Sequence, residues 1–245
     1  MKRIFLMAAI ASAVSTQSFA QASFGIQVGG NLGFVKYEDG SGNEQTNDPR
    51  LGVLAGVVAD VPLGPISFRP ELNYIQKGFK NTNSSTTLGI TNASEDKWSL
   101  NYVEVPLNFV YNLNAGSGKV FFGLGPNFGF GISGQTKSNR TVSSGGGSLS
   151  NTDKVDVKFD GKNDANDNKI HLKSFDMGAD VLAGYSSAMG LTFNVGYTYG
   201  FSDISPNNNS GSTLKNSGLT FKVGYMFGGS GGSTKSKSTT SSSGM

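Results

Sequence analysis

The sequence predicts an all-β protein: an eight-stranded antiparallel up-and-down β-barrel that crosses a membrane. Three observations lead to this fold class. Eight segments alternate between apolar and polar residues with the period of two that is typical of strands. Short turns alternate with long polar connections between these segments, as in outer-membrane barrels. One face of the segments also carries more aromatic side chains than a narrow barrel can hold inside.

The chain begins with the pattern of an export signal. Lys2 and Arg3 precede an apolar stretch of 11 residues, Ile4 to Val14, and small residues follow at Ser18 and Ala20. A membrane-spanning helix needs about 20 apolar residues, so this stretch is too short for one. We therefore expect residues 1–20 to be a signal peptide that is cleaved after Ala20. No later segment is long and apolar enough for a membrane helix, so membrane insertion would require a closed barrel.

The expected strands and connections follow in order along the chain. The eight strands are predicted at 24–35, 51–61, 66–79, 99–113, 119–133, 171–185, 191–205 and 217–227. Three short connections are expected at 62–65, 114–118 and 186–190, and four long ones at 36–50, 80–98, 134–170 and 206–216. The long connections are rich in Asn, Ser, Gly, Asp and Thr, which predicts polar loops. Strands of 11–15 residues suit a tilted transmembrane strand of about 9–11 residues that extends beyond the membrane.

The two faces of these strands differ in composition. One face carries 18 aromatic residues, whereas the other carries only Tyr102 and Phe121. The interior of an eight-stranded barrel is barely wide enough for side chains, so the aromatic face is predicted to contact lipid. The other face is mostly Gly, Asn, Ser and Thr and should line the lumen, where 14 of the 35 glycines fall. Glycine allows the close approach of backbones in a narrow barrel.

Charged residues also fall on the predicted lumen face. They form the candidate lumen network: Asp60, Arg69, Glu71, Lys77, Glu104, Asp176, Asp180 and Lys222. Because buried charges need partners, we expect salt bridges that plug the barrel, with Arg69 at the centre, reaching Glu71, Glu104, Asp176 or Asp180. A proton or ion path, or a carboxylate pair for catalysis, is the functional alternative.

Composition excludes several kinds of site. The sequence has no cysteine, which excludes disulfides, thiol catalysis and cysteine metal sites. Its single histidine, His171, excludes a multi-histidine metal site. Without Lys2 and Arg3 the basic residues number 18 against 17 acidic ones, which is no footprint for nucleic acid. We therefore expect no cofactor, no metal and no nucleic-acid partner.

The connection 134–170 holds the remaining candidates. It shows weak strand character at 154–160, and Asp160 to Asn168 (DGKNDANDN) has oxygen ligands at a density that calcium sites share, without EF-hand spacing. A calcium site and a solvated polar loop are both open. His171 starts the next expected strand at the barrel mouth, where we expect a polar loop-edge residue and no catalytic role. A Ser/His or Asp/His catalytic pair there is the alternative.

Several segments resemble known barrel sequences. The last strand, LTFKVGYMF, places Leu219, Phe221, Val223, Tyr225 and Phe227 on one face and resembles the C-terminal signal read by the barrel assembly machinery. The segments RPELNYIQKG (69–78), LNYVEVPL (100–107), FGLGP (122–126) and DMGADVLAG (176–184) are similar to the PorT-like outer-membrane β-barrel family of Gram-negative bacteria. This resemblance covers about residues 20–227 and implies an eight-stranded outer-membrane barrel, but little about activity. Barrels of that family often end at the final aromatic residue, whereas 18 residues follow Phe227 here.

These observations give one domain organisation and three hypotheses for function. We expect a signal peptide at 1–20, an outer-membrane β-barrel at 21–227 and a flexible, Gly/Ser-rich periplasmic tail at 228–245. The favoured hypothesis is a non-enzymatic barrel with a plugged polar lumen that presents extracellular loops for binding, adhesion or envelope integrity. The alternatives are an accessory subunit of an envelope or protein-secretion complex, and a small outer-membrane enzyme or channel. Expected partners are outer-membrane lipid, the barrel assembly machinery during biogenesis, and envelope or secretion-complex proteins.

Overall fold

A computed structural model describes residues 22–162, 167–206 and 212–228 of the chain. The expected signal peptide and all but the first residue of the expected tail lie outside this part, as does the middle of the segment 160–168. No helix in the described ranges is long and apolar enough to cross a membrane.

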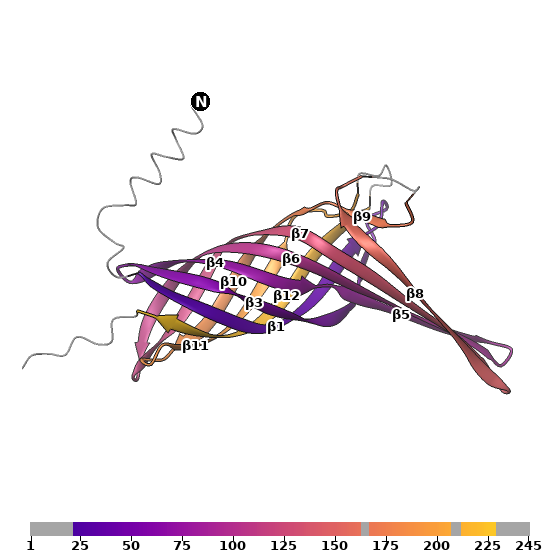
Figure 1. The fold of residues 1–245 in the computed structure, drawn as a ribbon, viewed down its shortest axis with the longest axis horizontal. Coiled ribbons are helices and arrows are strands. Elements are labelled where there is room, and N and C mark those ends of the chain that lie inside the picture. Colours follow the sequence, from indigo (N-terminus) through magenta and orange to yellow (C-terminus); the bar gives the residue numbers. More distant parts are fainter. Residues whose placement is uncertain (1–21, 163–166, 207–211, 229–245) are drawn as a thin grey trace, which may run out of the picture.

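Eight strands form a closed barrel, which Figure 1 shows from the side. They are β1 (Ser23–Glu38), β3 (Asp48–Leu63), β4 (Ile66–Lys77), β6 (Ile90–Ala115), β7 (Gly118–Ser144), β10 (Phe175–Ser186), β11 (Leu191–Gly200) and β12 (Thr213–Phe227). Each pairs antiparallel with the next, and β12 pairs with β1 to close the ring. Closure leaves no free sheet edge in the wall. The predicted fold class is confirmed.

The expected short connections are tight turns at one end of the barrel. Leu63 pairs with Ile66 around Gly64, which has a φ of 81°, and Ala115 pairs with Gly118 around Gly116, at 60°. Glycine adopts this left-handed conformation without steric cost.

The other end differs from the expectation, because the predicted loops 80–98 and 134–170 are largely strand. β5 (Phe79–Thr87) and β8 (Gly147–Phe159) continue the pairing beyond the barrel together with residues 90–98 of β6 and 134–144 of β7. We call this four-stranded extension the projecting sheet; it reaches well past the barrel rim (Figure 1). The loop prediction was wrong because both faces of this sheet are exposed over most of its length, so polar composition reflects solvent contact and not a lack of backbone pairing. The weak strand character at 154–160 marked the end of β8.

Two shorter strands lie at the rim, and two of the predicted wall strands are shorter than expected. β2 (Glu44–Thr46) pairs with β1, and β9 (Ile170–Leu172) pairs parallel with β8. The predicted strand 171–185 therefore begins only at Phe175, and the predicted strand 191–205 ends at Gly200. Leu172 and Ile204 lie in these excluded parts and are buried at the mouth, which explains why their apolar character resembled that of a wall strand.

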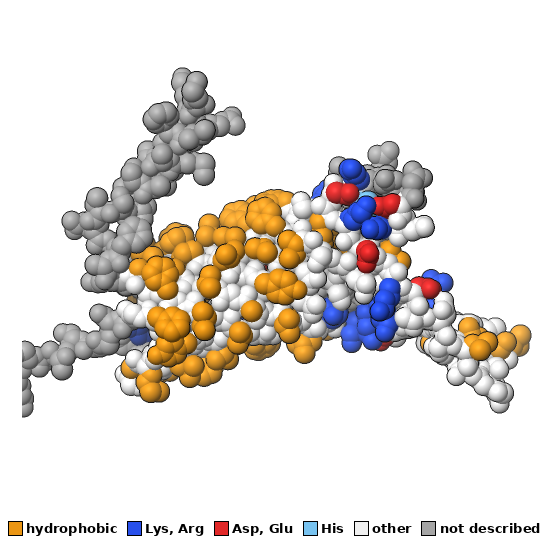
Figure 2. Space-filling model, viewed as in Figure 1, with side chains coloured by type: hydrophobic (Ala, Val, Ile, Leu, Met, Phe, Trp, Pro, Cys, Tyr) orange, Lys and Arg blue, Asp and Glu red, His pale blue; other side chains and the backbone are white. Residues whose placement is uncertain are grey.

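The two faces of the wall are as different as the sequence predicts. Phe24, Phe109 and Phe221 are each more than half exposed, whereas Tyr102 and Phe121 are fully buried inside. On the face that Figure 2 shows, exposed apolar side chains form a band across the barrel, and charged side chains gather beyond the band toward the projecting sheet. An apolar outer surface of this extent requires lipid contact.

Glycines on the inner face allow neighbouring strands to approach closely. A Cβ atom at Gly29 would collide with the carbonyl oxygen of Phe221 on β12, and one at Gly125 with that of Leu107 on β6. The high glycine content therefore has a direct steric cause in the narrow lumen.

Candidate functional site: the barrel lumen and its mouth

Alternation along β4 points Arg69, Glu71 and Lys77 into the lumen, each toward a different partner. Arg69 lies nearest the short turns. Its Nε donates a hydrogen bond of 2.8 Å to Asp60 on the neighbouring β3, and its guanidinium carbon lies 4.2 Å from the centre of the Phe121 ring. This first layer of the lumen joins one ion pair to an aromatic ring.

The second layer is centred on Glu71. The Nζ of Lys222, on β12, lies 2.6 Å from Oε2 of Glu71. The same oxygen accepts hydrogen bonds from the side-chain amides of Gln27, at 2.7 Å, and Asn73, at 2.9 Å. The buried carboxylate thus has a cation and two neutral donors, which offset its loss of hydration.

The third layer is centred on Lys77, which binds two carboxylates. Its Nζ lies 2.6 Å from Glu104 on β6 and 3.0 Å from Asp176 on β10. Asn216 donates to Asp176 at 2.9 Å, and the ring of Tyr102 lies 4.9 Å from the Lys77 ammonium. The space left around these side chains is too small for a water molecule.

Asp180 is the member of the candidate network without an ion pair in the described chain. It accepts hydrogen bonds from Thr198, at 2.7 Å, and from Asn127, at 3.1 Å. All eight candidate residues are buried, at no more than 9% exposure. The arrangement differs from the expected one, however, because Arg69 pairs with Asp60 on the adjacent strand and does not reach the four carboxylates proposed for it.

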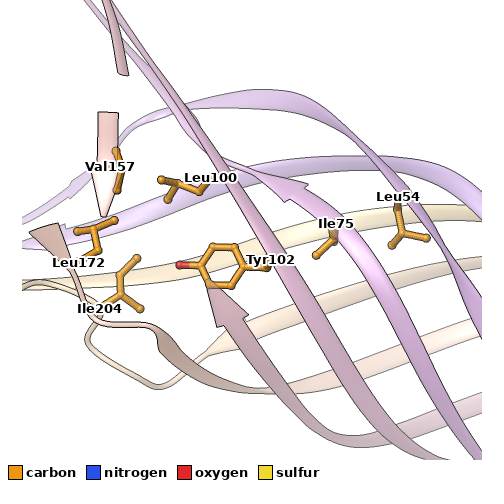
Figure 3. Packing of buried hydrophobic residues seen from close by; sticks show 7 residues of the cluster. All are labelled: Leu54, Ile75, Leu100, Tyr102, Val157, Leu172 and Ile204. Atoms are coloured by element: carbon orange, nitrogen blue, oxygen red, sulfur yellow. The ribbon is translucent and has the colours of Figure 1, made fainter. Parts of the chain in front are cut away.

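An apolar layer covers the network at the mouth of the barrel. Leu54, Ile75, Leu100 and Tyr102 come from the wall, whereas Val157, Leu172 and Ile204 come from β8, β9 and the segment after β11 (Figure 3). The ring of Phe159 packs edge-on against Tyr102, with 5.3 Å between the ring centres. We did not predict this layer from the sequence; the signal was the presence of isolated large apolar residues within polar connections.

Above the apolar layer lies a cavity of about 600 Å³, which we call the mouth pocket. Phe79 and Trp98 stack on its wall at 5.2 Å between ring centres, and Lys162, Lys169 and His171 also line it. Trp98 is the only tryptophan of the chain. Its place in a predicted polar loop was the available signal for this pocket.

His171 is held by two carboxylates at the edge of the pocket. Its Nδ1 lies 2.7 Å from Asp160 and its Nε2 lies 3.0 Å from Asp167. The hydrogen bond with Asp160, and then that with Asp167, raises the pKa of His171 above its ordinary value. The pKa of Asp160 is lowered mainly by His171, and that of Asp167 mainly by Lys158 and then by His171. Both ring nitrogens thus contact carboxylate oxygens.

Two carboxylates of the candidate calcium segment, 160–168, take part in the contacts of His171. Asp160 and Asp167 both pair with His171, and Asp167 also pairs with Lys158. Residues 163–166 lie outside the described chain. Within the described ranges, no group of three or more His, Asp or Glu residues is arranged to hold a metal ion.

Comparisons with known proteins place the barrel among outer-membrane proteins. Residues 17–205 match a family described as "Outer membrane protein beta-barrel domain". Among solved structures, the attachment invasion locus protein Ail of Yersinia pestis is similar, with 12% identity, coverage of 84% of this chain and 99% of that one, and a TM-score of 0.37. Neisserial surface protein A (14% identity, 86% and 99% coverage, TM-score 0.35) and the Escherichia coli protease OmpT (10%, 87% and 99%, TM-score 0.25) are also similar. No curated protein sequence matches the chain.

Proposed function

The chain belongs to the outer membrane protein beta-barrel domain family, and we propose that it is a non-enzymatic outer-membrane scaffold with a closed lumen. Its projecting sheet and mouth pocket serve recognition outside the cell. Outer-membrane barrels have short periplasmic turns and long extracellular connections, so the end that carries the projecting sheet is the extracellular one.

The filling of the lumen carries this proposal. Charged side chains are paired in three successive layers around Asp60, Glu71 and Lys77, and an apolar layer lies above them. An eight-stranded barrel has little internal volume, and side chains occupy it here. The gap that Lys77 lines with Glu104 and Asp176 has no space for a water molecule, which supports a closed lumen at this level.

The same contacts favour a non-enzymatic role. Glu71, Glu104 and Asp176 are paired with lysines in the lumen and are at most 4% exposed. At the mouth, the two nitrogens of His171 are bound to carboxylates. A general base needs a free position facing its substrate, so these pairings support a non-enzymatic role.

The tip of the projecting sheet supports a role in recognition. Leu88 is 97% exposed and adopts a φ of 52°, a conformation that is rare for leucine. Ile90, Val142 and Leu149 are also exposed, and Val142 pairs with Leu149 across the hairpin. Figure 2 shows apolar side chains at the far end of this otherwise polar extension. Apolar groups in strained, exposed positions are typical of interaction sites.

Biogenesis forms part of the same proposal. We propose that residues 1–20 are cleaved on export and that the assembly machinery reads the last strand. Its signal residues Phe221, Val223, Tyr225 and Phe227 are exposed on the outer face of β12, and Leu219 is partly exposed. The outward position makes these side chains accessible to a protein that inserts the barrel.

The finer PorT-like assignment is also a proposal. The segments that resemble that family carry six of the eight lumen charges, from Arg69 on β4 to Asp180 on β10. The resemblance therefore concerns the barrel wall and its interior. A role as an accessory subunit of an envelope or secretion complex is the second candidate, because the apolar tip around Leu88 suits a protein partner.

Ion conduction tests the closed lumen. The folded state of the purified protein is first verified by the shift in gel mobility on heating, and the protein is then inserted into planar bilayers. We expect no stepwise conductance from this protein, whereas a porin added to the same bilayer should give clear steps. Reproducible steps from the folded protein alone would contradict the proposal.

A further inference from the structure

Four lysines form one row across the projecting sheet. Lys80 pairs with Lys97, Lys97 with Lys137, and Lys137 with Lys154, so one lysine comes from each of β5, β6, β7 and β8. Directly opposite residues in a sheet point to the same face. Like charges in this position destabilise the pairing of the strands. We call these four residues the lysine row.

The lysine row lies on the outer face of the sheet. Trp98, which follows Lys97 on β6, lines the mouth pocket, and neighbouring residues of a strand point to opposite faces. Lys97 and its row therefore face away from the pocket, on the side that continues the lipid-facing wall. In Figure 2, Lys and Arg side chains gather just beyond the apolar band, toward the projecting sheet.

The height of the row corresponds to the headgroup layer of the membrane. On β7, the exposed side chain of Ile132 is the last large apolar group before Lys137, five residues later. With the rise and tilt of a barrel strand, five residues correspond to about 13 Å along the membrane normal. A lysine side chain can reach back several ångströms over this gap.

The carboxylates near the row neutralise only part of its charge. Glu95 lies 2.5 Å from Lys97, Asp156 follows Lys154 on the same face, and Asp48 pairs with Lys80 in register. Across the ranges that the structure describes, no ion pair joins Lys80, Lys137 or Lys154 to a carboxylate. The ammonium groups of Lys137 and Lys154 are thus available to an external anion, whereas the charge of Lys80 acts on Glu95.

A second outward pair of lysines lies at the same end of the barrel. Lys36 on β1 pairs directly with Lys215 on β12, two residues beyond the outward-facing Phe34. The Lys36 ammonium lies 5.9 Å from the centre of the Tyr199 ring and 3.9 Å from Glu44. The pairing of like charges in the lysine row is thus repeated by one lysine pair on β1 and β12.

We propose that the lysine row binds phosphate groups of glycolipid headgroups in the outer leaflet of the surrounding membrane. Ammonium groups bind phosphate as compact point charges, and neighbouring strands space them at about 4.8 Å. A headgroup with more than one phosphate can therefore contact several members of the row at once. The bound anion also removes the repulsion between the opposed lysines. This inference does not depend on whether the lumen is closed.

The test uses the full-length barrel in phosphatidylcholine nanodiscs with increasing amounts of bisphosphorylated lipid A. Binding is followed by native mass spectrometry and by the shift in melting temperature. The informative variant is Lys137→Gln/Lys154→Gln, which changes two row members without an ion pair. The matched control is Lys162→Gln/Lys169→Gln, which removes the same charge at the mouth pocket. A heat-dependent gel shift shows that each variant is folded.

We expect the wild type and the control to retain lipid A. The Lys137→Gln/Lys154→Gln variant should bind it at least about tenfold more weakly. The difference should shrink at high salt. Equal binding by all three proteins, or an equal loss in the control, would overturn the proposal. Competition by inorganic phosphate at the same concentration as lipid A would also overturn it, because the site would then be one for free phosphate.

Discussion

Glu71 is the most enclosed carboxylate of the lumen, with a side chain that is only 1% exposed. It is tolerated there because Lys222 neutralises it and because Gln27 and Asn73 donate to it. Each lumen charge has such neighbours on other strands, so the network links the wall across the barrel. Its energetic value lies in the cost of breaking a pair, since a lone buried charge is strongly unfavourable.

Replacing Lys222 with Met should show this cost. Lys222→Met leaves Glu71 with amide donors alone, and we expect a loss of about 3–5 kcal/mol in the free energy of unfolding. The double variant Glu71→Gln/Lys222→Met removes both charges and should recover a large part of the loss. The stability of both variants is measured by urea unfolding in detergent micelles. Unfolding is monitored by the fluorescence of the single tryptophan, Trp98. A single variant as stable as the wild type would show that the pair has no such role.

For single residues, the period of two along each strand identified which side chains point inward, but not which of them form ion pairs with each other. The eight candidate residues are all buried, yet Arg69 binds Asp60 rather than the carboxylates expected for it. Partner choice depends on the stagger between strands, which brings Lys222 of β12 beside Glu71 of β4. The hydrophobic pattern of a single strand contains no information on this stagger.

The elements at the mouth are held together by the Asp160–His171–Asp167 contacts. His171 belongs to β9, whereas the carboxylates come from the connection that precedes it. The raised pKa of His171 means that its contribution to stability is present below about pH 6.5 and is lost as the pH rises through the higher value. The lowered pKa values of the carboxylates mean that theirs is lost only well below pH 3.8. The mouth should therefore be most firmly held in mildly acidic solution.

The single histidine allows a direct measurement of this effect. In untagged protein, the imidazole NMR signals all come from His171, and their titration midpoint should lie above 6.5. Asp160→Asn removes the larger cause and should lower the midpoint. Asp156→Asn, which changes an exposed carboxylate that does not contact His171, should leave it unchanged. A midpoint at or below 6.5 in the wild type would be inconsistent with the contacts described.

Elements within the membrane were more predictable than those outside it. Wall strands such as β4 and β12 alternate because one side meets lipid and the other the lumen, and their expected bounds lie within a few residues of the observed ones. β5 and β8 are exposed on both faces except near the mouth, at Phe79 and Val157, so most of their sequences lack that contrast. Their pairing follows from the continuation of β6 and β7 beyond the rim, which is a property of the neighbouring strands.

For the whole molecule, the layers are arranged along one axis. Tight turns lie at one end, the lumen network and apolar layer follow, and the mouth pocket and projecting sheet lie at the other end. Exposed apolar side chains such as Leu72 and Phe221 lie on the outer face of the strands that carry the network inside. We infer that the turns lie in the periplasm and that the projecting sheet lies outside the cell.

Cysteine labelling on intact cells tests this arrangement most directly, because the chain has no cysteine of its own. Ser144→Cys places a thiol at the exposed tip of β7, and Ser117→Cys places one in an exposed tight turn at the opposite end. A membrane-impermeant maleimide should label the Ser144→Cys variant on intact cells, and the Ser117→Cys variant only after the outer membrane is permeabilised. Labelling of the Ser117→Cys variant on intact cells, with the Ser144→Cys variant protected, would contradict the account.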